Sequence, residues 1–272
     1  SAKILNCRRM EHDDEFEIDI VPTLRLSKYK YVLTWFQEQL KRKQYGSRLE
    51  IDIAGVPHTF AWGGAHGALL KYHGKGLYLH VDVTSYYPSL MIKYGFLTRN
   101  SLTPEKFKEI YDTRVALKKA GKKEEQAPYK IVLNGTFGIS KDKNSPAYDP
   151  KQANNICING QLLLVDLIEK LEAVDGFQLI QSNTDGLIIK IPDTDEAFYQ
   201  TDDICYEWEH RTGMGLGFDV ITEIFQKDVN NYVFRFISIH SLRMEGDNTP
   251  YIFSKAPFAF PSTPSAWRSP YE

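Results

Sequence analysis

Residues 177–191 read FQLIQSNTDGLIIKI, two apolar runs on either side of a Thr-Asp-Gly sequence. An Asp-Gly pair between two such runs is a strong signal of a short β-hairpin. Upstream, residues 77–83 read LYLHVDV, which predicts a strand that ends close to Asp82. Asp185 is predicted at the tip of the hairpin, so the two aspartates can meet if their strands are neighbours.

Outward from these strands, the chain alternates between helical and extended patterns. We expect helices at 28–43, 103–121, 125–133, 152–173 and 196–210, short strands at 49–55 and 58–64, and a tight glycine turn at 63–68. Thr103 is the expected N-cap of the second helix, and the third is expected to end near Gly135 and Gly138. This order predicts an α+β fold, with helices on one face of a small antiparallel sheet.

Composition bounds the class of protein. The chain has 272 residues, 42% of them hydrophobic, which is enough to bury a core. Its formal net charge of -2 gives no overall indication of a polyanionic partner such as nucleic acid. Three cysteines are too few for a disulfide framework, and we interpret them as buried thiols. No apolar run reaches the roughly 18 residues of a membrane span, so we expect no membrane partner and a soluble, cytoplasmic protein.

A basic stretch interrupts this neutral average. Residues 114–123 read RVALKKAGKK, with five positive charges and no acid. Arg114 and Lys118 stand four residues apart on one predicted helix, and Lys130 and Asn134 do so on the next, so each pair shares a face. Such a cationic helical hairpin can attract a triphosphate or a nucleic-acid backbone.

Two aspartates beside cationic helices suit phosphoryl transfer. That reaction needs two divalent ions that clamp the attacking and leaving oxygens. Magnesium prefers oxygen ligands and keeps waters and phosphates in its shell, so Asp82 and Asp185 can suffice. Each aspartate taken alone is more often a solvated turn residue.

Three motifs strengthen the chemical interpretation when they are taken together. DVTSYYPS at 82–89 resembles motif A of the family B DNA polymerases, DxxSLYPS. KIVLNGTFG at 130–138 resembles motif B, KxxxNSxYG, and SNTDG at 182–186 resembles motif C, YGDTDS. With GGAHGA at 63–68 and KDVNNY at 227–232, the chain is most similar to the phage and organellar-plasmid branch of that family.

The resemblance assigns roles to individual residues. Asp82 and Asp185 become the catalytic residues and ligands of two Mg²⁺ ions, for which Mn²⁺ is a substitute. The expected nucleotide-binding residues are Ser85, Tyr86, Tyr87, Arg114, Lys118, Lys130 and Asn134, with Tyr87 as the steric gate that excludes a 2′-hydroxyl. The expected DNA-binding residues are Gly63, Gly64, Phe137, Gly138 and Tyr232. His66 is interpreted equally well as a structural hydrogen-bonding residue or as a DNA contact.

The sequence departs from the family at three places. Asn183 replaces the first aspartate of motif C, and Phe137 replaces the tyrosine of motif B. Of the KxY motif that steadies the primer terminus, only Tyr232 is kept. The first departure removes a negative charge from the site. The second removes a hydroxyl expected to support fidelity, and the third weakens the expected grip on the primer.

The resemblance implies a palm at 55–102 and 140–233, fingers at 103–139 and a connector at 1–54. A proofreading exonuclease and a thumb are not recognisable, which predicts a truncated DNA polymerase core, encoded by a phage or mobile element in a bacterial host. Its expected partners are primer-template DNA and deoxynucleoside triphosphates, with a terminal protein or other replication factors as further candidates. The sequence is also compatible with a catalytically impaired remnant that binds DNA weakly, and with an RNA-templated or protein-primed enzyme.

The last segment, 234–272, is predicted to be a non-native, disordered tail. ISIHSLRME at 237–245 and FPSTPSAWR at 260–268 can be encoded by one DNA string in adjacent reading frames. Such a repeat resembles a CRISPR array translated as protein. The hypothesis is tested by the coding nucleotides, which must align one base out of frame.

Overall fold

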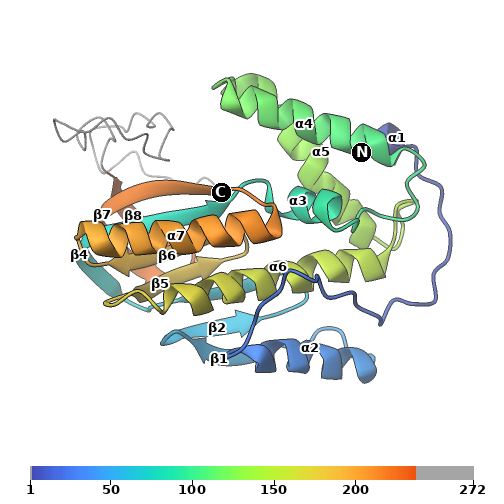
Figure 1. Cartoon of the computed structure of the whole chain (residues 1–272). Helices are drawn as coiled ribbons and strands as arrows, with labels where there is room; N and C mark the ends of the chain where they lie inside the picture. The colour runs from blue at the N-terminus through green and yellow to red at the C-terminus, as the bar shows by residue number, and fades with distance from the viewer. Residues whose placement is uncertain (1, 237–272) are drawn as a thin grey trace.

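The structure is a computed structural model, and it describes residues 2–236 (Figure 1). Its helices are α1 (Ala2–Leu5), α2 (Lys30–Lys41), α3 (Tyr86–Lys93), α4 (Pro104–Lys119), α5 (Lys123–Lys141), α6 (Pro150–Leu171) and α7 (Asp195–Thr212). Its strands are β1 (Leu49–Ile53), β2 (Val56–Phe60), β3 (Ala65–Ala68), β4 (Tyr72–Val83), β5 (Gln178–Asn183), β6 (Gly186–Ile191), β7 (Leu216–Asp228) and β8 (Asn231–Phe236). Most of the predicted tail therefore lies outside the described residues, while its first three residues pair within β8.

The strands of the described part form one eight-stranded sheet, in the order β1-β2-β3-β5-β6-β4-β7-β8. Every neighbouring pair in it is antiparallel. The mixture of helices with an antiparallel sheet confirms the α+β class. The expectation of a small sheet was wrong, because β3 joins the β1–β2 hairpin to β5 and so extends the sheet into the amino-terminal part of the chain.

Helices α6 and α7 pack on one face of the sheet and enclose the main core (Figure 1). Alternate residues of β4 point into that core, among them Leu79, Val81 and Val83. Trp208 of α7 is fully buried and donates from its indole nitrogen to the Leu163 carbonyl of α6 at 3.1 Å. Apolar strand faces and helix stripes thus meet as the periodicity of the sequence predicts.

Helix α6 also carries a polar stripe that holds an extended segment, residues 8–29, which we call the strap. The strap crosses α6 on its way to α2 (Figure 1). Its backbone amides donate to α6 side chains, from Asp19 to Asn155 at 2.9 Å and from Val21 to Asn159 at 3.0 Å. These side chains therefore supply the hydrogen-bond acceptors that a neighbouring strand would otherwise offer to the backbone of the strap.

Helices α4 and α5 form the predicted hairpin and project away from the sheet (Figure 1). The predicted end of the second helix was wrong, because α5 continues through Gly135 and Gly138 to Lys141. Leu133, Thr136 and Ser140 are buried along α5, and this packing outweighs the low helix propensity of glycine. Thr103 does precede α4, but its hydroxyl donates to the Leu5 carbonyl instead of capping the helix.

Two local turn predictions also needed correction. The expected tight turn at 63–68 covers only its first residues, since Ala65–Ala68 is strand β3. In the β5–β6 hairpin, Asn183 pairs with Gly186, so Thr184 and Asp185 form the two-residue turn. The glycine therefore belongs to the strand, where it faces β4.

Burial of the cysteines follows the prediction for Cys157 and Cys205, whereas Cys7 is half-buried. Among the described residues, none of the helices combines the length and apolar character needed to cross a bilayer.

Candidate functional site

Asp82 and Asp185, distant in the sequence, lie on neighbouring strands. Strand β4 pairs with β6, and Asp82 is the register partner of Gly186. The amide of Val83 donates to the carbonyl of Asp185 at 2.8 Å, which ties the end of β4 to the hairpin turn. Asp185 is exposed and Asp82 is half-buried. The backbone thus brings the two carboxylate-bearing residues together at one end of the strand pair.

Asp82 stands on the sheet face opposite the α6–α7 core. Its neighbours Val81 and Val83 point into that core, so Asp82 and His80 share the other face. His80 Nδ1 lies 3.5 Å from a carboxylate oxygen of Asp219, its partner on β7. Burial lowers the pKa of His80, but the hydrogen bond to Asp219 and the charges of Asp82, Asp219 and Asp185 outweigh burial and raise it. Three carboxylates therefore create a negative potential around one imidazole.

Both residues that pair with Asp82 on the adjacent strands are glycines, Gly186 on β6 and Gly217 on β7. A Cβ atom at Gly186 would lie 2.9 Å from the Val81 carbonyl and 3.5 Å from His80 Nε2. Larger residues are thus excluded from the position that faces Asp82 across the β4–β6 ladder.

The donor chemistry of this end of the sheet fits a hard divalent cation. Two carboxylates offer oxygen ligands, and Mg²⁺ completes its shell with waters and substrate phosphates. The part of the chain that the structure describes holds no cluster of three or more His, Cys, Asp or Glu residues suited to a metal. Waters and substrate phosphates would have to complete the shell of a metal held by the two carboxylates.

Ser85 connects this site to the helical hairpin. It precedes α3 in the left-handed conformation, with φ of 53°, which is costly for a residue other than glycine. The Arg114 guanidinium of α4 donates to the Ser85 hydroxyl and, through Nε, to Gln126 of α5 at 3.1 Å. Burial lowers the pKa of Arg114, while the charge of Asp82 acts to raise it. The hairpin thus directs a buried cation toward the end of β4.

The two tyrosines of motif A point in different directions. Tyr86, the first residue of α3, is buried and donates its hydroxyl to the Gly160 carbonyl of α6 at 2.6 Å, so its side chain is engaged by the core. Tyr87 is half-buried and donates to the Gly63 carbonyl at 2.9 Å. Its ring contacts Phe137, with 4.7 Å between ring centroids. Phe137 of motif B thus packs beside the predicted sugar gate.

The remaining predicted nucleotide-binding residues lie on the helical hairpin. Lys130 and Asn134 are exposed on α5, and Lys118 is half-buried on α4. Gly138 is exposed one turn after Asn134, and a Cβ there would meet no atom within 4 Å. With Arg114 and Phe137, six residues predicted to contact the nucleotide or DNA thus lie on the elements that project from the sheet.

Tyr232 lies well away from these residues. It pairs with Gln226 on β7, which in turn pairs with Tyr72 at the start of β4. Asp82 is ten residues further along β4, which corresponds to roughly 30 Å at the usual rise of a strand. The structure does not bring Tyr232 together with the carboxylates, and the order of the motifs along the chain does not predict this separation.

Sequence reasoning missed the His80–Asp219 contact and the glycine at 217. It also missed Lys141, whose ammonium donates to the Trp62 carbonyl at 2.8 Å and lies 5.4 Å from the Phe137 ring centroid. The alternation of LYLHVDV places His80 on the face of Asp82, which was an available signal. Gly217 and Lys141 depend on the register and packing of distant elements.

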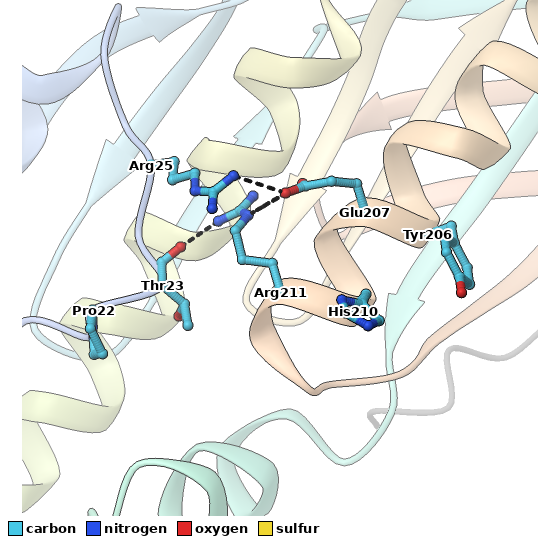
Figure 2. A pocket seen from close by; sticks show the side chains of 7 residues that line it. All are labelled: Pro22, Thr23, Arg25, Tyr206, Glu207, His210 and Arg211. Atoms are coloured by element: carbon cyan, nitrogen blue, oxygen red, sulfur yellow. Dashed lines mark hydrogen bonds and ion pairs between the residues drawn. The ribbon is translucent and has the colours of Figure 1, made fainter.

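A cavity of about 630 Å³ lies elsewhere, between the strap and α7 (Figure 2). Pro22, Thr23, Arg25, Tyr206, Glu207, His210 and Arg211 line it. Figure 2 shows that its charged side chains bind one another, with Glu207 between the two arginines. None of the predicted site residues lines this cavity, and its arginines are engaged by the protein itself.

Comparisons with known proteins complete this description. The sequence matches no protein-family model, and it matches no curated protein. Among solved structures, the chain is similar to the family B DNA polymerase from the hyperthermophilic archaeon Pyrobaculum calidifontis, with a TM-score of 0.45 and 17% sequence identity. The similarity covers 74% of this chain and 31% of that polymerase, so the chain spans about a third of its length.

Proposed function

We propose that this chain is the core of a template-directed DNA polymerase, which adds deoxynucleotides to a primer 3′-hydroxyl. The observation that carries the proposal is the convergence of Asp82 and Asp185 on neighbouring strands, tied by the 2.8 Å backbone hydrogen bond from Val83. Motifs A, B and C contribute residues to this region from separate parts of the chain. The GGAHGA sequence favours the phage and organellar-plasmid branch.

In this proposal the two carboxylates hold Mg²⁺, or Mn²⁺ in its place, which supplies the positive charge that phosphoryl transfer requires. Gly186 and Gly217, the register partners of Asp82, carry no side chains that could obstruct a phosphate beside it. The first amides of α3 and the Arg114 guanidinium lie beside Ser85, where they suit the triphosphate. Residues 55–102 and 140–233 then form the palm, and 103–139 form the fingers.

Cations on the hairpin support the nucleotide-binding role. Lys118 lies on α4 with Arg114, and Lys130 lies on α5 with Gln126 and the neutral Asn134. Fingers of this kind close over the correct nucleotide and so commit it to reaction. Primer-template DNA and deoxynucleoside triphosphates are the partners that this arrangement suits, and a terminal protein is a further candidate for priming.

The test is primer extension with a labelled primer-template, the four deoxynucleotides and Mg²⁺. Asp185→Asn and Asp82→Asn are each expected to reduce the rate roughly a thousandfold or more, since each removes one of the two metal-binding charges. Asp193→Asn is the matched control, because this exposed aspartate follows the opposite end of β6. It should retain the wild-type rate.

Extension that persists in both carboxylate variants would contradict the assigned site. If the wild-type chain folds and binds primer-template but adds no nucleotide with Mg²⁺ or Mn²⁺, it is a remnant that only binds DNA. Replacing the DNA template with RNA tests for an RNA-templated enzyme, and replacing the DNA primer with a protein hydroxyl tests for protein priming. Identical purification of the variants controls for contaminating polymerases.

A further inference from the structure

A short segment at residues 61–66, AWGGAH, runs from the end of β2 into the first residues of β3 and contacts α3, α5, α6 and the β5–β6 hairpin, and we call it the glycine loop. Its backbone carbonyls accept from Gln161 of α6 at Ala61, from Lys141 of α5 at Trp62 and from Tyr87 of α3 at Gly63. At its other end, His66 lies 2.9 Å from Asn183 of β5. The loop therefore links three helices to the hairpin that carries Asp185.

One side of the glycine loop fixes the ring of Tyr87. The hydroxyl is held at the Gly63 carbonyl, and Phe137 contacts the ring. Helix α6 passes close by, because a Cβ atom at Gly160 would lie only 3.5 Å from Tyr87 Cε1. The ring is thus held at its tip, by an aromatic neighbour and by the backbone of a core helix.

The other side of the loop packs against the turn of the β5–β6 hairpin. A Cβ atom at Gly64 would lie 2.9 Å from Thr184 Oγ1, so only glycine permits this approach. Asn183 Oδ1 accepts from the Thr184 amide at 2.8 Å, and His66 Nδ1 donates to the same oxygen. His66 thereby steadies Asn183, the residue that stands where the family has its first motif C aspartate.

From these contacts we infer that the glycine loop sets sugar selectivity, by fixing the Tyr87 ring relative to the turn that carries Asp185. The inference rests on the proposed function. A ring that is anchored at its hydroxyl cannot tilt away from the 2′-hydroxyl of a ribonucleotide. Release of the anchor lets the ring move, and the penalty against the extra hydroxyl falls. Gly63 and His66 are positioning residues in this scheme.

The principal test is Tyr87→Phe, which keeps the ring and removes the hydroxyl. The measurement is the ratio of kcat/KM for single insertion of a deoxynucleotide to that for the matching ribonucleotide. Loss of the hydroxyl, with its hydrogen bond to the Gly63 carbonyl and its contact with the Cys157 thiol, is expected to lower this ratio roughly threefold to tenfold. Tyr94→Phe is the matched control, because Tyr94 also donates its hydroxyl to a backbone carbonyl, that of Thr212, at 3.2 Å. That variant should keep the wild-type ratio.

A second set of variants tests the anchor at the hairpin turn. His66→Ala and Asn183→Ala are each expected to lower the ratio, and the double variant should lower it no further than the stronger single variant. His66→Asn should restore part of the ratio, because an asparagine amide can donate to Asn183 in place of Nδ1. Additive effects in the double variant would show that His66 and Asn183 act separately, and would contradict the inference that they form one anchor for the glycine loop.

The outcomes distinguish this inference from the proposed function. If the wild-type chain extends primers but Tyr87→Phe keeps the wild-type ratio, the polymerase assignment stands and the inference is wrong. If the wild-type chain adds no nucleotide, the ratio of equilibrium Kd values for dATP and ATP, measured by dialysis with Mn²⁺, replaces the kinetic ratio. An unchanged Kd ratio in Tyr87→Phe, or no binding of either nucleotide, would then overturn the inference.

Discussion

At the junction of α6 and α7, Asp166 is fully buried, and both of its oxygens accept from the Arg211 guanidinium, at 3.0 and 3.1 Å. Asp185, on the β5–β6 turn, is exposed, and its charge acts on His80 together with those of Asp82 and Asp219. The first centre joins opposite charges, whereas the second gathers like charges around one imidazole.

This difference distinguishes a charge that is satisfied within the protein from charges that the proposed function assigns to metal binding. Asp166 also accepts from the Arg25 amide of the strap at 2.7 Å, so its charge is satisfied within the protein. Like charges at the end of β4 repel one another, and in the proposed function they would bind a cation that arrives with substrate. The cavity in Figure 2 lies beside the satisfied centre, which explains why its size alone does not indicate a site.

The largest expected effect on stability comes from Asp166→Ala. It leaves the Arg211 guanidinium, whose side chain is only 6% exposed, without its bidentate partner. Loss of one member of a buried ion pair costs about 3–5 kcal/mol of the free energy of unfolding. Urea denaturation followed by circular dichroism measures this cost, with Asp193→Ala as an exposed control. A loss below about 1 kcal/mol would contradict the structural role of the pair.

Asn159→Ala should have the next largest effect, because it detaches the middle of the strap from α6. Asn159 is buried, accepts from the Val21 amide and donates to the Asp19 carbonyl at 2.8 Å. Leaving these buried groups unsatisfied costs about 1–3 kcal/mol. Hydrogen exchange should then accelerate in the strap before the sheet. Uniform acceleration across the chain would show that the strap is not a separate unit.

Acid should weaken the anchor of the strap at Asp14. The Arg99 guanidinium donates to both oxygens of Asp14, at 2.7 and 2.9 Å, and this lowers the pKa of Asp14 to about 2. A lowered pKa stabilises the fold above about pH 4, the range of a free aspartate, and the contribution is lost as pH falls toward 2. The free energy of unfolding of Asp14→Asn should therefore depend less on pH in this window. An unchanged pH profile would contradict the assignment.

The smallest effect on stability is expected at the site itself. Asp185→Asn removes one of the like charges around His80 and should change the free energy of unfolding by no more than about 0.5 kcal/mol. The measurement is the same urea titration that is used for Asp166→Ala. Destabilisation comparable to that of Asp166→Ala would remove the distinction between the two centres.

Local pattern was enough to predict most elements of the fold. Alternation in LYLHVDV and the two apolar runs at 177–191 predicted β4 and the β5–β6 hairpin, because side chains on a strand face opposite sides in turn. Helical spacing predicted α2, α4, α6 and α7 to within a few residues. The carboxylates Asp82 and Asp185 were also identified from the sequence, since each ends or follows a strand in a motif.

Only the tertiary structure decided which of these residues meet. Strand register places glycines on both sides of Asp82 and puts Tyr232 at the other end of the sheet, and no local pattern encodes the pairing of distant strands. The length of α5 was likewise set by burial of Leu133 and Thr136, which outweighs its glycines. Local propensities act over a few residues, whereas a site depends on contacts between residues a hundred positions apart.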